Sequence, residues 1–110
     1  MSVVSVYAIF ASRAEAEEIG RAMIEERLAA CVNILGEVQS LYRWNEKIES
    51  GEEIAAIFKT SEAGVDALIT GIAALHSYEV PCIATWRIDK ILASYADWVE
   101  RNVGSVTRSR

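Results

Sequence analysis

The chain has 110 residues, of which 52% are hydrophobic and 25% are charged, and its formal net charge is −5. A chain of this size is expected to form one domain with a buried hydrophobic core. Its acidity argues against nucleic-acid binding, because the neutralisation of phosphates requires clustered basic side chains. No apolar run approaches the roughly 20 residues that a membrane helix needs, and the N-terminal segment lacks a signal-peptide pattern. We therefore expect a cytoplasmic protein that binds neither nucleic acid nor membranes.

The first two predicted elements are a strand and an amphipathic helix. Residues 3–10 are rich in β-branched and apolar side chains, as expected of a strand that is covered on both faces. Ser12 then opens a Ser-x-x-Glu capping box, in which Ser12 caps the helix and Glu15 reaches back to the N–H of Ser12. The following apolar positions share one face of a helix, which is expected to lie on a sheet: Ala16, Ile19, Gly20, Met23 and Ile24.

A long β-hairpin is predicted next. Residues 30–35 and 37–44 are β-rich on either side of Gly36, and residues 47–60 return as a second strand after a turn at Asn45–Glu46. Gly51 marks the expected bulge or bend. Strands this long exceed the usual five or six residues and would extend beyond the sheet of a small domain. Because exposed strand edges are usually avoided or paired, the hairpin predicts an oligomer.

The second half of the chain predicts a helix, a strand and a final helix. Ser61 caps a helix whose apolar stripe consists of Val65, Leu68, Ile69, Ile72 and Leu75. A strand follows over residues 82–88, and residues 94–102 form a helix that Ser94 caps together with Asp97 and that Gly104 ends. The order indicates an α+β fold, a ferredoxin-like βαββαβ sandwich with helices on one face and an additional C-terminal helix. We expect a single domain over residues 1–110, with its core over 3–103 and a flexible tail over 104–110.

The segment "HSYEVPC" (76–82) carries three candidate metal ligands, His76, Glu79 and Cys82. Each also has a structural interpretation. His76 continues the apolar stripe into the last turn of its helix, which suits a partly buried histidine that is hydrogen-bonded near the helix end. In the structural interpretation, Cys82 is a small buried apolar residue and Glu79 is a solvated carboxylate in a loop. The spacing matches no established zinc pattern, so the sequence leaves both interpretations open.

Catalytic and nucleotide-binding patterns are absent from the sequence. It contains no nucleophile elbow, Walker motif or dinucleotide-binding glycine pattern. A nucleophile pair of Cys82 and His76 would lack a third, orienting residue. Two cysteines, Cys31 and Cys82, are also too few for a disulfide framework and are expected to stay reduced. We therefore expect a protein that is not an enzyme.

Five segments, in this order and spacing, resemble the CutA family of divalent-cation tolerance proteins. They are "EERLAACVNI" (25–34), "SLYRWNEKIES" (40–50), "FKTSE" (58–62), "HSYEVPCI" (76–83) and "YADWV" (95–99). The resemblance extends from about Val3 to Val103. It implies a ferredoxin-like fold and a tight, PII-like homotrimer in which the long hairpins, here residues 29–60, pair between subunits. It also implies a cytoplasmic protein with a link to tolerance of copper and other divalent metal ions.

The segment at 76–82 departs from the family pattern at two positions. The usual sequence there is His-Pro-Tyr-Glu-Val-Pro-Glu, whereas this chain has Ser77 for the first Pro and Cys82 for the final Glu. Some members also carry a first-strand Cys that has been proposed as a copper ligand, and that position is Ala8 here. A copper role that depends on the first-strand thiol therefore does not transfer. We hypothesise that Cys82 supplies a thiolate in its place.

Three functions follow from these residues and the resemblance. The first is a homotrimer that binds copper or another divalent metal ion through His76, with Cys82 and Glu79 as further ligands. The second is a PII-like signalling trimer that binds a small ligand or a protein partner in the clefts between subunits. The candidate cleft residues are Tyr42, Trp44, Lys59, Glu79 and Trp86. The third is a structural trimer that serves as an assembly scaffold.

Overall fold

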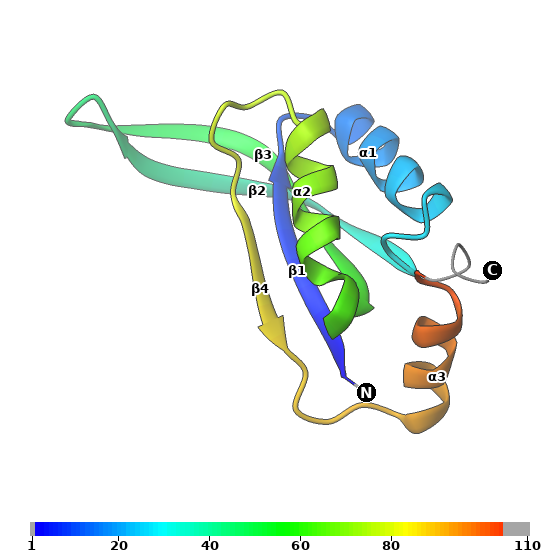
Figure 1. Ribbon diagram of the computed structural model, residues 1–110. Helices are drawn as coiled ribbons and strands as arrows, with labels where there is room; N and C mark the ends of the chain where they lie inside the picture. Colours follow the sequence, from blue (N-terminus) through cyan, green and yellow to red (C-terminus); the bar gives the residue numbers. More distant parts are fainter. Residues whose placement is uncertain (1, 105–110) are drawn as a thin grey trace.

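The computed structural model describes residues 2–104, which form a four-stranded antiparallel sheet and three α-helices (Figure 1). Their order is β1 (Val3–Phe10), α1 (Arg13–Glu25), β2 (Cys31–Trp44), β3 (Lys47–Ser61), a 3₁₀ turn (Glu62–Gly64), α2 (Val65–Leu75), β4 (Ile83–Arg87) and α3 (Ala93–Arg101). None of the helices within residues 2–104 is long and apolar enough to cross a membrane.

The sheet has the strand order β2-β3-β1-β4, with β1 and β3 at its centre. β1 pairs with β3 from Val3 opposite Ser61 to Phe10 opposite Ile54, and it pairs with β4 on its other side. This arrangement is the predicted α+β, ferredoxin-like βαββαβ sandwich, followed by the predicted C-terminal helix. The fold class is therefore confirmed.

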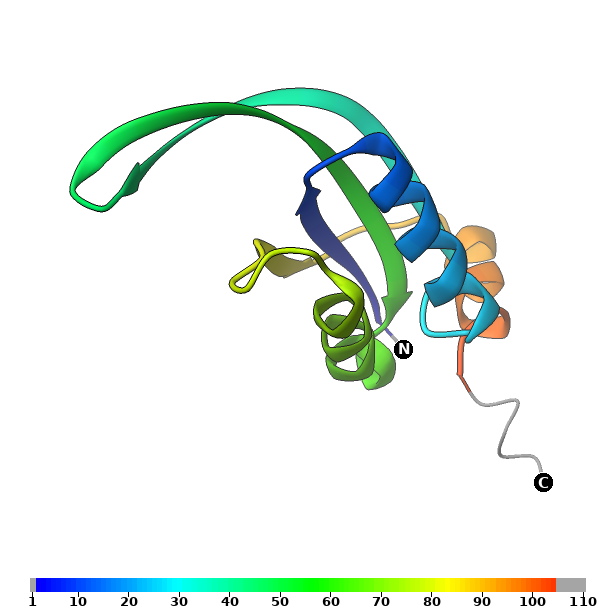
Figure 2. The same cartoon turned by 90° about the horizontal axis from the view of Figure 1, so that it is seen from above.

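The main core lies between one face of the sheet and the helices α1 and α2 (Figure 2). Its largest fully buried side chains are Phe10, Phe58, Met23, Leu68 and Ile72. A smaller cluster holds α3 against the start of β1, and it consists of Val3, Ala30, Val99 and Val103. Because side chains alternate along a strand, Val3 points to the face opposite α1 and α2, and α3 packs on that face around Val3 and Cys31.

The β2–β3 hairpin extends well beyond the rest of the sheet (Figures 1 and 2). β2 has 14 residues and β3 has 15, whereas β1 has 8 and pairs only with the second half of β3. The turn is formed by Asn45 and Glu46, which both have positive φ, as the tight hairpin turn requires. Residues 41–50 are all exposed, including Leu41, Trp44 and Ile48. The outer half of the hairpin therefore has no core of its own within the subunit.

The bulge in this hairpin lies at Leu35–Gly36 and not at Gly51. The register between β2 and β3 shifts between Ile34 and Gly36, whereas Gly51 pairs in register with Ser40. Gly36 has a φ of 118°, a conformation that a residue with a Cβ rarely adopts. The less exposed residues of β2 are even-numbered on both sides of this bulge, from Val32 and Ile34 to Val38 and Ser40.

Several predicted ends differ from the structure. The last helix begins at Ala93 after Leu92, so Ser94 lies inside its first turn and caps nothing. Gly104 has a positive φ of 69°, but the helix ends at Arg101 and the Gly104 N–H donates to the carbonyl of Arg27. β4 is shorter than predicted by a residue at each end. Of the predicted flexible tail, residues 105–110 lie outside the described part of the chain.

The two Ser-x-x-acid sequences, at Ser12 and Ser94, give a first prediction. Ser12 Oγ accepts a hydrogen bond of 3.1 Å from the Glu15 N–H, whereas α3 has no side-chain cap. Ser12→Ala is therefore expected to lower the free energy of unfolding by about 1 kcal/mol. Ser94→Ala removes the same hydroxyl from a Ser-x-x-acid sequence that does not cap, and should change it by less than about 0.5 kcal/mol. Urea denaturation at one protein concentration measures both. Equal losses in the two variants would contradict this assignment of the caps.

Candidate functional site

The segment 76–82 leaves the end of α2 and crosses the end of β1 on its way to β4 (Figure 1). α2 ends at Leu75, and His76 has extended backbone angles (φ −72°, ψ 146°). His76 therefore follows the helix, whereas the sequence placed it in the last helical turn. The N–H of Ile9 in β1 donates to the carbonyl of Cys82, which holds the far end of the segment against the same strand.

The His76 ring is fully buried and both of its nitrogens are engaged. Nε2 lies 2.7 Å from the carbonyl oxygen of Ile9, and Nδ1 lies 3.0 Å from the backbone nitrogen of Tyr78. Because a carbonyl only accepts and an amide N–H only donates, these two contacts fit the tautomer that carries its proton on Nε2. The ring also stacks on Phe10 with the centroids 5.1 Å apart. This geometry agrees with the structural interpretation of His76 as a hydrogen-bonded residue at a helix end.

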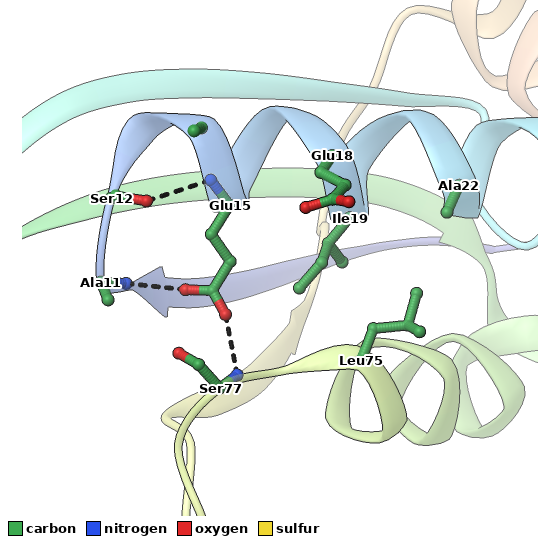
Figure 3. Close-up of a pocket in the computed structure, with 9 residues that line it drawn as sticks. Ala11, Ser12, Glu15, Glu18, Ile19, Ala22, Leu75 and Ser77 are labelled. Carbon is green, nitrogen blue, oxygen red and sulfur yellow. Dashed lines mark hydrogen bonds between the residues drawn. The ribbon is translucent and has the colours of Figure 1, made fainter.

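Glu15 connects the start of α1 to the same segment by a hydrogen bond (Figure 3). One carboxylate oxygen accepts a 3.0 Å bond from the N–H of Ala11, and the other accepts a 2.7 Å bond from the N–H of Ser77. The capping box thus reaches Ala11, one residue before the predicted Ser12. Partial burial would raise the pKa of Glu15, but the hydrogen bonds from Ser77 and Ala11 outweigh it, so the pKa is lowered.

Tyr78 connects the segment to the hairpin. Its hydroxyl donates a 2.7 Å hydrogen bond to a carboxylate oxygen of Glu53, just beyond the part of β3 that pairs with β1. Burial, and then the bond to the Glu53 carboxylate, raise the pKa of Tyr78 to about 12. The phenol therefore stays protonated near neutral pH and keeps this bond. The sequence analysis did not identify Glu15, Tyr78 and Glu53 as a group, because contacts between distant segments leave no local pattern.

The other two candidate metal ligands, Glu79 and Cys82, are exposed. Within residues 2–104, no three His, Cys, Asp or Glu side chains form a group suited to hold a metal ion. The structure therefore does not bring His76, Glu79 and Cys82 together in one subunit as a ligand set. For His76 to bind a metal ion, one of its two hydrogen bonds would have to break. Metal binding by these residues stays a prediction.

The candidate cleft residues lie in separate places. Tyr42 and Trp44 are on the outer part of the hairpin, 47% and 63% exposed. Lys59 and Trp86 both pair with Ser5, one on each side of β1, so they lie on the sheet face opposite α1 and α2. Glu79 lies in the loop before β4. Within one subunit the candidates thus lie in three places, which are the outer hairpin, the row through Lys59 and Trp86, and the loop before β4. Their role in a cleft between subunits stays a prediction.

The lowered pKa of Glu15 predicts acid sensitivity that depends on this residue. Since the folded-state pKa is below the ordinary value of 4.5, the ionised carboxylate contributes stability above that pH. This contribution is lost as the pH falls through the folded-state pKa. Glu15→Gln is therefore expected to flatten the fall in unfolding free energy below about pH 4.5, measured by urea titration. Glu18→Gln, one turn along the same helix, is the control, and an unchanged acid profile in Glu15→Gln would contradict the assignment.

Comparisons with known proteins agree on one family. The sequence profile of the CutA1 divalent ion tolerance protein matches residues 4–102. The divalent-cation tolerance protein CutA of Thermotoga maritima is 39% identical over 92% of this chain and 99% of the relative. Mouse protein CutA is 37% identical over 86% of this chain but 53% of the relative, so the chain spans about half the length of that protein.

Solved structures of this family share the fold. CutA from Xylella fastidiosa superimposes with a TM-score of 0.92 and 35% identity, covering 94% of this chain and 100% of that one. CutA from Archaeoglobus fulgidus, described as periplasmic, has a TM-score of 0.89 and 35% identity over 93% of this chain and 99% of that one. With a profile match over nearly its whole length and this degree of identity, the chain belongs to the CutA1 divalent ion tolerance family.

Proposed function

We propose that the protein is a homotrimeric divalent-cation tolerance protein that binds copper or another divalent metal ion and has no enzymatic activity. Membership of the CutA1 family supports the role in metal tolerance. We also propose the cytoplasm as its compartment. The two free cysteines, Cys31 and Cys82, support this because reduced thiols are typical of that compartment.

The trimer is proposed mainly because the outer half of the β2–β3 hairpin is exposed in one subunit. Leu41, Trp44 and Ile48 are 69%, 63% and 72% exposed on strands that no third strand or helix covers. Apolar side chains and free backbone groups of this kind favour association with another chain. A copy of the same chain is the simplest partner, because a closed ring of identical subunits covers every hairpin in the same way.

Metal binding is proposed to use the exposed end of the 76–82 segment. The Cys82 thiolate suits copper and zinc, and the Glu79 carboxylate suits divalent ions in general. One subunit supplies too few ligands there, so the proposed site is completed by a neighbouring subunit. His76 joins this site only if Nδ1 gives up the amide of Tyr78.

A second candidate function is binding of a small ligand or protein partner in a cleft between subunits. It is favoured by Lys59, whose ammonium has no carboxylate within 4.0 Å in the described part of the chain. Lys59 is a partly buried cation on the same sheet face as Trp86, across β1 from it, and such a face suits an anionic, planar ligand. Saturable quenching of tryptophan fluorescence by such a ligand without added metal, lost in Lys59→Gln, tests this function.

The trimer predicts a strong effect of polar substitutions at the hairpin tip. Replacing both Trp44 and Ile48 by Ser removes apolar surface that the proposed interface buries. The protein concentration at which the trimer dissociates is therefore expected to rise by at least about tenfold. Sedimentation velocity over a dilution series measures it. Leu92→Ser, at an equally exposed leucine away from the hairpin (73%), is the control. A monomeric wild-type protein, or a variant trimer of unchanged strength, would refute this assembly.

The metal site predicts a difference between the two cysteines. Removal of the Cys82 thiol is expected to weaken copper binding to the reduced protein by about tenfold or more, because one of the proposed metal ligands is lost. Cys31→Ser makes the same chemical change at a half-buried thiol next to Tyr95 and should leave binding unchanged. Equilibrium dialysis with elemental analysis gives stoichiometry and affinity. Unchanged copper affinity in Cys82→Ser would exclude the thiolate as a ligand.

A further inference from the structure

A groove of about 610 Å³ lies between α1 and the end of α2 (Figure 3). It is on the side of the molecule that α1 and α2 cover, away from the open sheet face that holds Lys59 and Trp86. Its floor is apolar and consists of Ile19, Ala22 and Leu75. Ile19 is almost fully buried, whereas Leu75 is 52% exposed and points toward α1. The groove therefore leaves apolar surface in contact with water.

One end of this groove is acidic. Glu15 and Glu18 lie one helical turn apart on α1 and both line it, and none of its nine described lining residues is basic. The Glu15 carboxylate is held in place by the N–H groups of Ala11 and Ser77, one on each oxygen. Each oxygen keeps a second lone pair that can accept another hydrogen bond. Glu18 makes no hydrogen bond or ion pair with another described residue, and its carboxylate lies beside Ile19 in the groove (Figure 3).

We propose that this groove binds a small aliphatic primary amine. The ammonium group lies between the Glu15 and Glu18 carboxylates, and the unbranched alkyl chain lies over Ile19 and Ala22 and covers Leu75. A cationic head matches the two carboxylates, and its N–H donors meet the Glu15 oxygens, which are held in place before the ligand arrives, and the unpaired carboxylate of Glu18. The chain gains by removing the Leu75 side chain from water.

The size of the groove favours a small molecule over a protein partner. Its volume is within the range of roughly 300–1,000 Å³ that small-molecule sites occupy. A stable protein interface instead buries about 800 Å² on each partner, far more than nine residues of a single groove provide. The amine site does not depend on metal binding or on the hairpin, so its test is independent of the proposed function.

The test uses hexylamine as the probe, with the full chain at neutral pH, where a primary amine is charged. Chemical shifts of the Ser77 and Ala22 amides in ¹⁵N-labelled protein report on the two ends of the groove. We expect saturable shifts with hexylamine. Hexan-1-ol lacks the charge and methylamine lacks the chain, so the affinity of each should be lower than that of hexylamine by at least about tenfold.

Variants separate a site from general attraction to an acidic protein. Glu18→Gln is expected to weaken hexylamine binding by about threefold, as for an exposed ion pair. Glu17→Gln makes the same change on an exposed residue of α1 outside the groove and should leave binding unchanged. Leu75→Ser should also weaken it, whereas Leu92→Ser should not. Shifts that never saturate, or equal losses in Glu17→Gln and Glu18→Gln, would overturn the proposal.

Discussion

The difference in length between the strands constrains the rest of this structure. β1 supports β3 only from Ile54 to Ser61, so residues 47–53 of β3 pair with β2 alone. A two-stranded ribbon without a covered face is at best marginally stable in water. The order seen in the hairpin therefore needs contacts that one subunit does not supply. In the proposed trimer, completing the hairpin and assembling the subunits would be the same event.

The hydrogen bonds around His76 link this hairpin to the helical side of the subunit. His76 joins the end of α2 to β1 through Ile9, Glu15 joins α1 to Ser77, and Tyr78 joins the segment to Glu53 on β3. The bonds of His76 and Tyr78 are partly buried, whereas the bond from Ser77 to Glu15 is exposed. Together they restrict the conformation of the segment. The segment that carries Glu79 and Cys82 is thus held by all three neighbouring elements. A rigid support of this kind suits a site whose remaining ligands come from another subunit.

Local patterns in the sequence predict the elements well and their long-range contacts poorly. The periodicities gave the order of strands and helices, and the Ser12 cap was visible because its hydrogen bond spans three residues. The same pattern at Ser94 was misleading, because the packing of Ile91 and Val99 in the second core places the start of α3. Similarly, the helical spacing placed His76 on a buried stripe, but the Ile9 carbonyl that its Nε2 contacts is more than 60 residues away in the chain.

In the proposed trimer, in which the hairpins pair between subunits, the free edge of β2 lies against a neighbouring copy. Hydrogen exchange of the β2 amides over residues 37–44, followed by NMR at a concentration where the protein is assembled, tests it most directly. In one subunit, only the amides that point toward β3 have partners, since β2 is at the edge of the sheet. Our account predicts that the outward-pointing amides are protected as strongly as the inward-pointing ones. Outward-pointing amides that exchange as fast as those of an exposed loop would contradict it.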